Sequence, residues 1–180
     1  KARRPMVITT LHGTDITLVG TDPSYYQIVK FSIEHSDCVT AVSKSLADQT
    51  QEYFRISKPI EMIYNFFVPK PECLNHKPEK TNFVRGNEKL LVHASNYRPL
   101  KRSMDVLKIF HEIRRVLPVK LLFVGNGPEI GSVRQSVIDQ HLEEDVFFVG
   151  VTRKIDPYIA CADLLLLPSQ QESFGLVALE

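Results

Sequence analysis

Basic side chains follow the predicted strand at residues 89–94, in the stretch Ser95-Asn-Tyr-Arg-Pro-Leu-Lys-Arg102. Arg98, Lys101 and Arg102 would lie beside the N-terminus of the next predicted helix, where free backbone N–H groups carry partial positive charge. Cations beside such donors suit a diphosphate. The alternative is a set of solvated loop charges, and the position at a strand-to-helix turn leaves both interpretations open.

Two glycines follow the next predicted strand, in Gly125-Asn-Gly-Pro-Glu129. Gly125 and Gly127 permit a tight turn and a close approach of a ligand to the backbone. The pattern is not the dinucleotide-binding fingerprint, because it stops at Gly-x-Gly and Pro128 suits the first turn of a helix. A ligand loop and an ordinary strand-to-helix turn are both compatible with it.

A third polar string, residues 168–180, follows the predicted strand at 164–167. Its glutamates, Glu172 and Glu180, could hold sugar hydroxyls on either side of a helix N-terminus. That N-terminus would offer the backbone N–H groups of Phe174, Gly175 and Leu176 to an anionic or polyhydroxylated ligand. The simpler interpretation, Ser173 as an N-cap among incidental acids, explains single residues but not the whole string.

His12 follows the first predicted strand, in His12-Gly-Thr-Asp15. A lone histidine is more often structural than catalytic, but the adjacent glycine and the position at a strand end favour a site. The other five histidines lie on predicted helices, in the linker or within a strand, and receive no role.

Several function classes are disfavoured by what the sequence lacks. No two aspartates are separated by a single residue, so the acidic pair that often binds a divalent metal on a nucleotide-sugar is missing. There is no Gly-x-Ser-x-Gly elbow and no phosphate loop ending in Gly-Lys-Ser/Thr. The net charge of +1 argues against a nucleic-acid binder. No apolar run approaches the roughly 20 residues of a membrane span.

Short apolar runs alternate with amphipathic stretches, which is typical of α/β domains with parallel sheets flanked by helices. The sequence predicts parts of two Rossmann-like domains, at residues 1–65 and 88–180, joined by a linker at 66–87 that holds Pro69, Pro71 and Pro78. The predicted strands are residues 6–10, 38–42, 60–64, 89–94, 120–124, 146–149 and 164–167. The predicted helices are residues 25–35, 43–54 capped by Ser43, a helix capped by Ser103 that buries Met104, Leu107, Phe110, Ile113 and Leu117, one ending near 141, and 155–161. In such sheets ligands bind beyond the carboxyl ends of the strands.

Taken together, these strings resemble the retaining glycosyltransferases of family 4, which have the GT-B fold. The most specific marker is Glu172-Ser-Phe-Gly-Leu-Val-Ala-Leu-Glu180, which is similar to that family's pair of glutamates with seven residues between them. The strings at residues 9–17, 36–46, 63–66 and 93–102 look closest to the branch that transfers N-acetylglucosamine (GlcNAc) to L-malate, the first step of bacillithiol synthesis.

The resemblance implies roles for individual residues. Arg98 and Lys101 would neutralise the UDP diphosphate without a metal, although many members have Gly-Arg where this chain has Ser95-Asn96. Glu180 would bind the ribose and Glu172 the transferred sugar. The remaining implied contacts are the amides of Phe174, Gly175 and Leu176 at the sugar and β-phosphate, Gly125 and Gly127 at the nucleotide, Arg153 near uracil, and His12 at the sugar.

The implied reaction moves GlcNAc from UDP-GlcNAc to L-malate with retention of configuration and without a cofactor or metal. A reducing cytoplasm is the expected compartment, because the three cysteines form neither a disulfide framework nor a zinc site. Homo-oligomerisation stays open. We expect the chain to be a central part of a longer two-domain enzyme. The alternatives are a family member with a lipid or polysaccharide acceptor, a nucleotide-binding fragment without catalysis, and a scaffolding protein.

Overall fold

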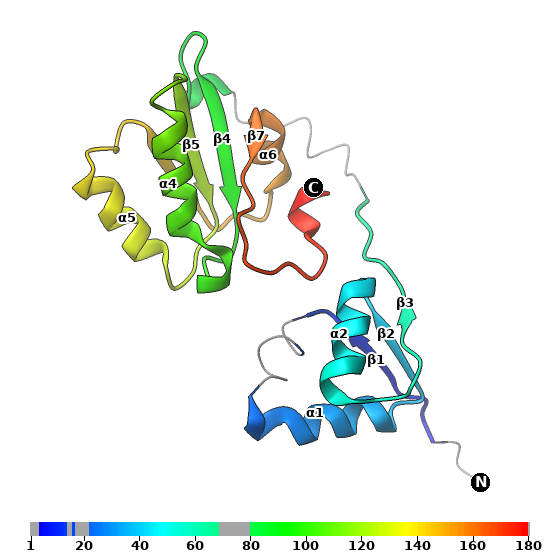
Figure 1. Cartoon of the computed structure of the whole chain (residues 1–180). Coiled ribbons are helices and arrows are strands. Elements are labelled where there is room, and N and C mark those ends of the chain that lie inside the picture. The colour runs from blue at the N-terminus through cyan, green and yellow to red at the C-terminus, as the bar shows by residue number, and fades with distance from the viewer. Residues whose placement is uncertain (1–3, 14–15, 17–21, 69–79, 180) are drawn as a thin grey trace. The chain divides into compact units, whose positions relative to one another are not determined.

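A computed structural model describes residues 4–13, 16, 22–68 and 80–179 (Figure 1). The chain divides into two compact units. Unit 1 comprises Lys1–Phe66 and Glu172–Leu176, and unit 2 comprises Phe67–Gln171 and Val177–Glu180. Each unit is described by itself.

Unit 1 contains a parallel sheet in the order β1-β2-β3, built from β1 (Ile8–Leu11), β2 (Cys38–Ala41) and β3 (Glu61–Met62). The helices α1 (Pro23–His35) and α2 (Lys44–Phe54) connect consecutive strands. Ser43 caps α2 as predicted, because its hydroxyl accepts a hydrogen bond from Leu46 N at 3.3 Å. Both helices pack on the sheet face formed by Leu11, Val39 and Ala41.

Unit 2 contains a four-stranded parallel sheet in the order β6-β5-β4-β7 (Figure 1). Its strands are β4 (Lys89–Ala94), β5 (Val119–Val124), β6 (Val146–Gly150) and β7 (Leu164–Leu165). The helices α4 (Ser103–Ile113) and α5 (Ile130–Asp139) cover the face that presents Leu91 and Leu121, and α6 (Asp156–Cys161) packs on the face that presents Leu90 and Leu122. Since both faces are buried, the central strands are continuous apolar runs.

Three predicted details are wrong. Ser103 is the first residue of α4 and not its N-cap, because the turn η3 (Pro99–Lys101) leads into Arg102, which takes the cap position at φ 53°. Leu117 is 52% exposed, because α4 ends at Ile113 and Pro118 disfavours a helical residue before it. The expected helix after Phe174 is, within the described residues, a short 3₁₀ turn, η4 (Leu176–Ala178), which directly follows Gly175 at φ 76°.

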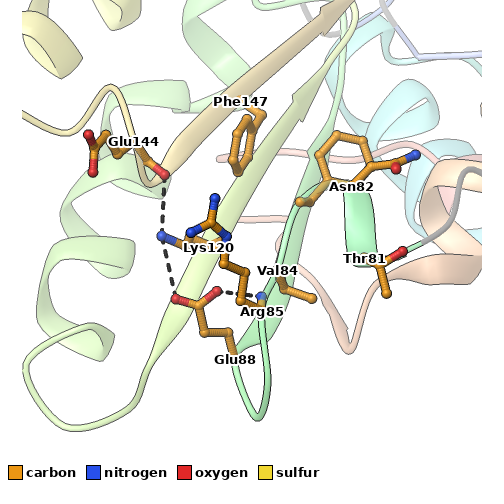
Figure 2. A pocket seen from close by; sticks show the side chains of 9 residues that line it. Thr81, Asn82, Val84, Arg85, Glu88, Lys120, Glu144 and Phe147 are labelled. Carbon is orange, nitrogen blue, oxygen red and sulfur yellow. Dashed lines mark hydrogen bonds and ion pairs between the residues drawn. The ribbon is translucent and has the colours of Figure 1, made fainter.

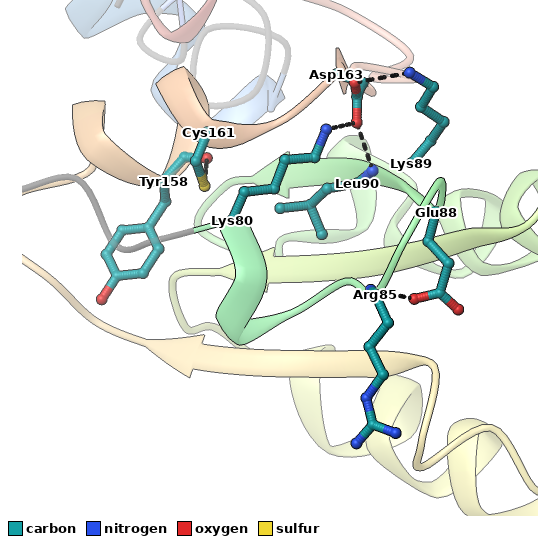
Figure 3. A network of polar contacts seen from close by, with 8 residues as sticks. All are labelled: Lys80, Arg85, Glu88, Lys89, Leu90, Tyr158, Cys161 and Asp163. Carbon is teal, nitrogen blue, oxygen red and sulfur yellow. Dashed lines mark hydrogen bonds and ion pairs between the residues drawn. The ribbon is translucent and has the colours of Figure 1, made fainter.

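The start of unit 2 is held by a polar network around Asp163 (Figure 3). Lys80, in the turn η2 (Lys80–Asn82), and Lys89 both form ion pairs with this carboxylate. The amide of Leu90 donates to Asp163 Oδ2 at 2.8 Å. The hydrogen bonds from Lys80 and from the Leu90 amide lower the pKa of Asp163. Asp163 therefore ties the beginning of β4 to the beginning of β7.

Candidate functional site

The strand order of unit 2 reverses between β4 and β7, because the chain leaves β6 at one edge and returns to the other side of β4 (Figure 1). In open parallel sheets ligands bind beyond the carboxyl ends of the strands at such a reversal. The loop Ser95–Arg102 follows β4 and the loop Leu166–Gln171 follows β7. The predicted diphosphate ligands Arg98 and Lys101 therefore lie at the expected place in the fold.

Tyr97 organises the loop after β4. It is fully buried and adopts φ 44°, a left-handed conformation that is uncommon outside glycine. Its amide donates to Ser95 Oγ at 3.2 Å, its hydroxyl donates to the carbonyl of Val124 at 3.3 Å, and its carbonyl accepts from the amide of Glu129 at 3.0 Å. Burial raises the pKa of Tyr97, so the hydroxyl keeps its proton and stays a donor.

The two predicted ligand-loop glycines pack against the loop after β4. A Cβ atom on Gly125, whose φ is 117°, would lie 2.1 Å from the carbonyl oxygen of Ser95. A Cβ atom on Gly127 would lie 1.8 Å from the carbonyl oxygen of Asn96. The contact between the two loops thus requires glycine at both positions. The contact of these glycines with a nucleotide remains a prediction.

The basic residues of the loop differ in how they are engaged. Arg102 Nε donates to Asp105 Oδ2 at 2.6 Å, and Lys108 pairs with the same carboxylate. Hydrogen bonds from Lys108 and Arg102 lower the pKa of Asp105. Arg98 is exposed, and its guanidinium has no ion pair or hydrogen bond within the described part of the chain. Arg98 is therefore the arginine of this loop that is available to an anion.

Two hydrogen bonds join β4 and the loop that follows it to the loop after β7. The amide of Gln170 donates to the carbonyl of Leu100 at 2.9 Å. The side chain of His93, on β4, is bonded through Nδ1 to the carbonyl of Leu166 at 2.9 Å. His93 had no predicted role in the site. The available signal was a polar residue inside an otherwise apolar strand.

Other predicted site residues belong to unit 1. His12 directly follows β1 and is exposed, and its neighbour Gly13 is buried at φ 127°. A Cβ atom on Gly13 would lie 1.6 Å from Ser173 Oγ, so the glycine is required by the segment Glu172–Leu176. Phe174 packs on the core of this unit. Unit 1 thus holds His12 with Glu172, Phe174, Gly175 and Leu176, whereas unit 2 holds Arg98, Lys101, Gly125, Gly127 and Arg153. Glu180 lies outside the described residues.

A cavity of about 570 Å³ lies at the opposite edge of the unit 2 sheet, near the amino ends of β5 and β6 (Figure 2). Lys120 points into it, with Nζ 2.6 Å from Asp145 Oδ1 and 3.4 Å from Glu88 Oε1. The hydrogen bond from Lys120 to Asp145 raises the pKa of Lys120, so its charge is kept and is compensated by these two carboxylates. The charge of Lys120 in this cavity is therefore compensated, unlike that of Arg98.

Membrane spans and metal clusters are both absent from the described residues. No helix in the described part is long and apolar enough to cross a bilayer. Within those same ranges, no group of three His, Cys, Asp or Glu side chains is arranged to hold a metal ion.

Known families match both parts of the chain. The model of the glycosyl transferases group 1 matches residues 88–180, and the model of Glycosyltransferase Family 4 matches residues 1–70.

Two relatives match nearly the whole chain. N-acetyl-alpha-D-glucosaminyl L-malate synthase of Bacillus anthracis is 43% identical over 98% of this chain and 47% of its own length. An uncharacterized glycosyltransferase of Methanocaldococcus jannaschii, MJ1607, is 24% identical over 96% of this chain and 48% of its own. The chain thus spans about half the length of the curated relatives it matches.

Solved structures share the fold. The Anabaena protein Alr3699/HepE, crystallised with UDP-glucose, superposes with a TM-score of 0.78 at 18% identity and covers 96% of this chain and 49% of that one. TarM superposes with a TM-score of 0.72 at 19% identity and covers 94% of this chain and 33% of that one. These neighbours are GT-B glycosyltransferases, so the predicted α/β fold class is confirmed.

Proposed function

This chain belongs to the group 1 glycosyl transferases, and we propose that the protein moves GlcNAc from UDP-GlcNAc to a hydroxyl of L-malate. The observation that carries the proposal is the 43% identity to the Bacillus anthracis synthase over 98% of the chain. This identity extends across residues of both units.

The proposed transfer proceeds with retention and without a metal. The bond between the sugar C1 and the β-phosphate oxygen breaks, and a bond from C1 to the malate oxygen forms on the same face. The malate hydroxyl proton passes to the departing phosphate. Arg98 and Lys101 stabilise the charge that grows on this leaving group, and such electrostatic stabilisation often contributes more to catalysis than any other single effect. This role is supported by the position of Arg98 at the strand-order reversal and by its guanidinium, which has no ion pair or hydrogen bond within the described residues.

The remaining predicted residues hold the donor in this proposal. Glu180 binds the ribose hydroxyls and Glu172 the hydroxyls of the transferred sugar. The amides of Phe174, Gly175 and Leu176 contact the sugar and the β-phosphate, and His12 contacts the sugar. Gly125, Gly127 and Arg153 lie along the nucleotide. The reaction is placed in the cytoplasm, and its partners are a nucleotide-sugar and a small acceptor.

The direct test uses the protein at its full natural length. UDP-GlcNAc is incubated with L-malate, or separately with lipid or polysaccharide acceptors, and products are identified by mass spectrometry. We expect GlcNAc-malate and stoichiometric UDP. If a lipid or polysaccharide acceptor is glycosylated and L-malate is not, the proposed acceptor is wrong and the glycosyltransferase assignment stays. Absence of both turnover and a UDP-induced rise in Tm would overturn the donor site itself.

A further inference from the structure

His93 lies on β4, is fully buried, and contacts polar atoms of unit 2 through both ring nitrogens. Its Nδ1 is 2.9 Å from the carbonyl oxygen of Leu166, and its Nε2 is 3.0 Å from Ser95 Oγ. The ring packs edge-on against Tyr97 and Phe123, with centroid distances of 5.7 Å and 5.9 Å. One imidazole therefore touches the loop after β4 and the loop after β7.

The direction of these hydrogen bonds follows from the chemistry of the partners. A carbonyl oxygen only accepts, so Nδ1 must carry the proton that it donates to Leu166. In the neutral ring Nε2 then accepts the hydroxyl proton of Ser95. The Ser95 oxygen in turn accepts from the amide of Tyr97 at 3.2 Å. The result is a continuous series of hydrogen bonds from Tyr97 through Ser95 and His93 to Leu166.

This series of hydrogen bonds begins where the pairing of β4 with β7 ends. The two strands pair through Leu91 with Leu164 and Val92 with Leu165. The amide of Leu166 then donates to the carbonyl of Val92 at 2.8 Å. The carbonyl of the same Leu166 is bonded to the His93 ring, so a side chain continues the connection at the point where the strand order reverses.

We propose that His93 is a positioning residue for the donor nucleotide. It fixes the loop that carries Arg98 and Lys101 against the loop that follows β7, and so sets the geometry of the anion-binding edge. The inference rests on the proposed function, because it takes a nucleotide diphosphate as the ligand of these loops. His93 itself is enclosed by protein, so it acts through its contacts with Ser95 and Leu166.

The test compares variants that remove the two bonds separately and together. In His93→Phe an aromatic ring is kept, but the hydrogen bonds to Leu166 and to Ser95 are both lost. In His93→Asn the side-chain amide can still donate to Leu166. Ser95→Ala removes the bonds of Ser95 Oγ to the His93 ring and to the Tyr97 amide, and leaves the bond between His93 and Leu166. The control is Leu91→Val, two residues earlier on the same face of β4, which weakens the core without touching either loop.

For each variant the Kd for UDP is measured by calorimetry and the Tm by scanning calorimetry, with the protein at its full natural length. We expect His93→Phe to raise the Kd about tenfold, since two buried hydrogen bonds are lost. His93→Asn and Ser95→Ala should each raise the Kd only about threefold. Leu91→Val should lower the Tm and leave the Kd within about twofold of the wild type.

A Kd in His93→Phe within twofold of the wild type, or Kd values that only follow the Tm across all variants, would overturn the positioning role. If His93→Phe does not fold, Ser95→Ala alone decides, and an unchanged Kd in it overturns the proposal.

If the wild type binds no UDP, the proposed function fails independently. Hydrogen exchange of Ser95–Arg102 and Leu166–Gln171 then decides whether His93 orders the loops: faster exchange in His93→Phe than in Leu91→Val supports that role, and equal exchange overturns it.

Discussion

A Cβ atom on Gly127 would lie 1.8 Å from the carbonyl oxygen of Asn96, so the loop after β5 packs directly on the backbone of the loop after β4. Because a backbone oxygen cannot turn away as a side chain can, we expect Gly127→Ala to lower the free energy of unfolding by about 2 kcal/mol. Gly131 in α5 faces open space, so Gly131→Ala should raise stability by about 0.5–1 kcal/mol. Urea denaturation of both variants checks this pair, and equal midpoints would contradict it.

The serines at the starts of two helices should respond differently to alanine. Ser43 caps α2, so Ser43→Ala should lower the free energy of unfolding by about 1 kcal/mol. Ser103 Oγ is buried and has no hydrogen-bond partner in the part of the chain that the structure describes. Ser103→Ala should therefore be neutral or stabilising by up to about 1 kcal/mol. Thermal unfolding of both variants checks the difference, and equal losses would restore a capping role for Ser103.

Asp163→Asn should lower stability at neutral pH by about 1 kcal/mol, because the bonds to Lys80, Lys89 and the Leu90 amide favour the charged carboxylate. Since the pKa of Asp163 is lowered on folding, its stabilisation is present above the unfolded value of about 3.9 and is lost as pH falls through the folded value. The difference between wild type and Asp163→Asn should thus shrink below about pH 4. A difference that stays constant from pH 7 to pH 3, in urea titrations, would refute this linkage.

Arg98 and Arg102 provide a matched pair for the anion site. Arg98→Ala should raise the Kd for UDP about tenfold, the effect of losing one charge-assisted hydrogen bond. Arg102 is bound to Asp105, so Arg102→Ala should change the Kd less than about twofold. Calorimetric titration at low and high salt measures both variants. Equal effects of the two substitutions would indicate general attraction by a basic surface rather than a contact at Arg98.

Glu180→Gln should raise the KM for the donor with little change in kcat, because the proposed ribose contact binds substrate and transition state alike. Glu172→Gln should also lower kcat, since this glutamate is proposed to hold the sugar that moves. Steady-state kinetics of the protein at its full natural length separate the two effects. Unchanged kinetics in Glu180→Gln would remove its role at the ribose.

The sequence predicted the elements best where burial alone decides them. Lys89–Ala94 was predicted with its observed bounds, because a strand buried on both faces is a continuous apolar run. Ser103 was predicted as a cap because its residue type suits one, whereas the left-handed Arg102 that occupies the position has no local sequence signal.

The candidate site was predictable only in part. The strand ends and the basic loop followed from the alternation of apolar and amphipathic runs. The role of Gly127 in loop packing depends on Asn96, about thirty residues away, and the contacts of His93 depend on Leu166, 73 residues away. Such long-range contacts leave no periodic pattern in the sequence, so the structure was needed to find them. The roles assigned to His12, Glu172 and Glu180 remain predictions.

The strand order also determines when β4 gains its second neighbour during synthesis. β4 is central, yet its neighbour β7 is the last strand along the described residues. Since ribosomes deliver the chain from its N-terminus, β4 has an unpaired edge until Leu164 and Leu165 have emerged. An open apolar edge is a template for pairing with other chains. The edge of β4 is therefore open until β7 forms, and Asp163, immediately ahead of β7, then bonds the Leu90 amide.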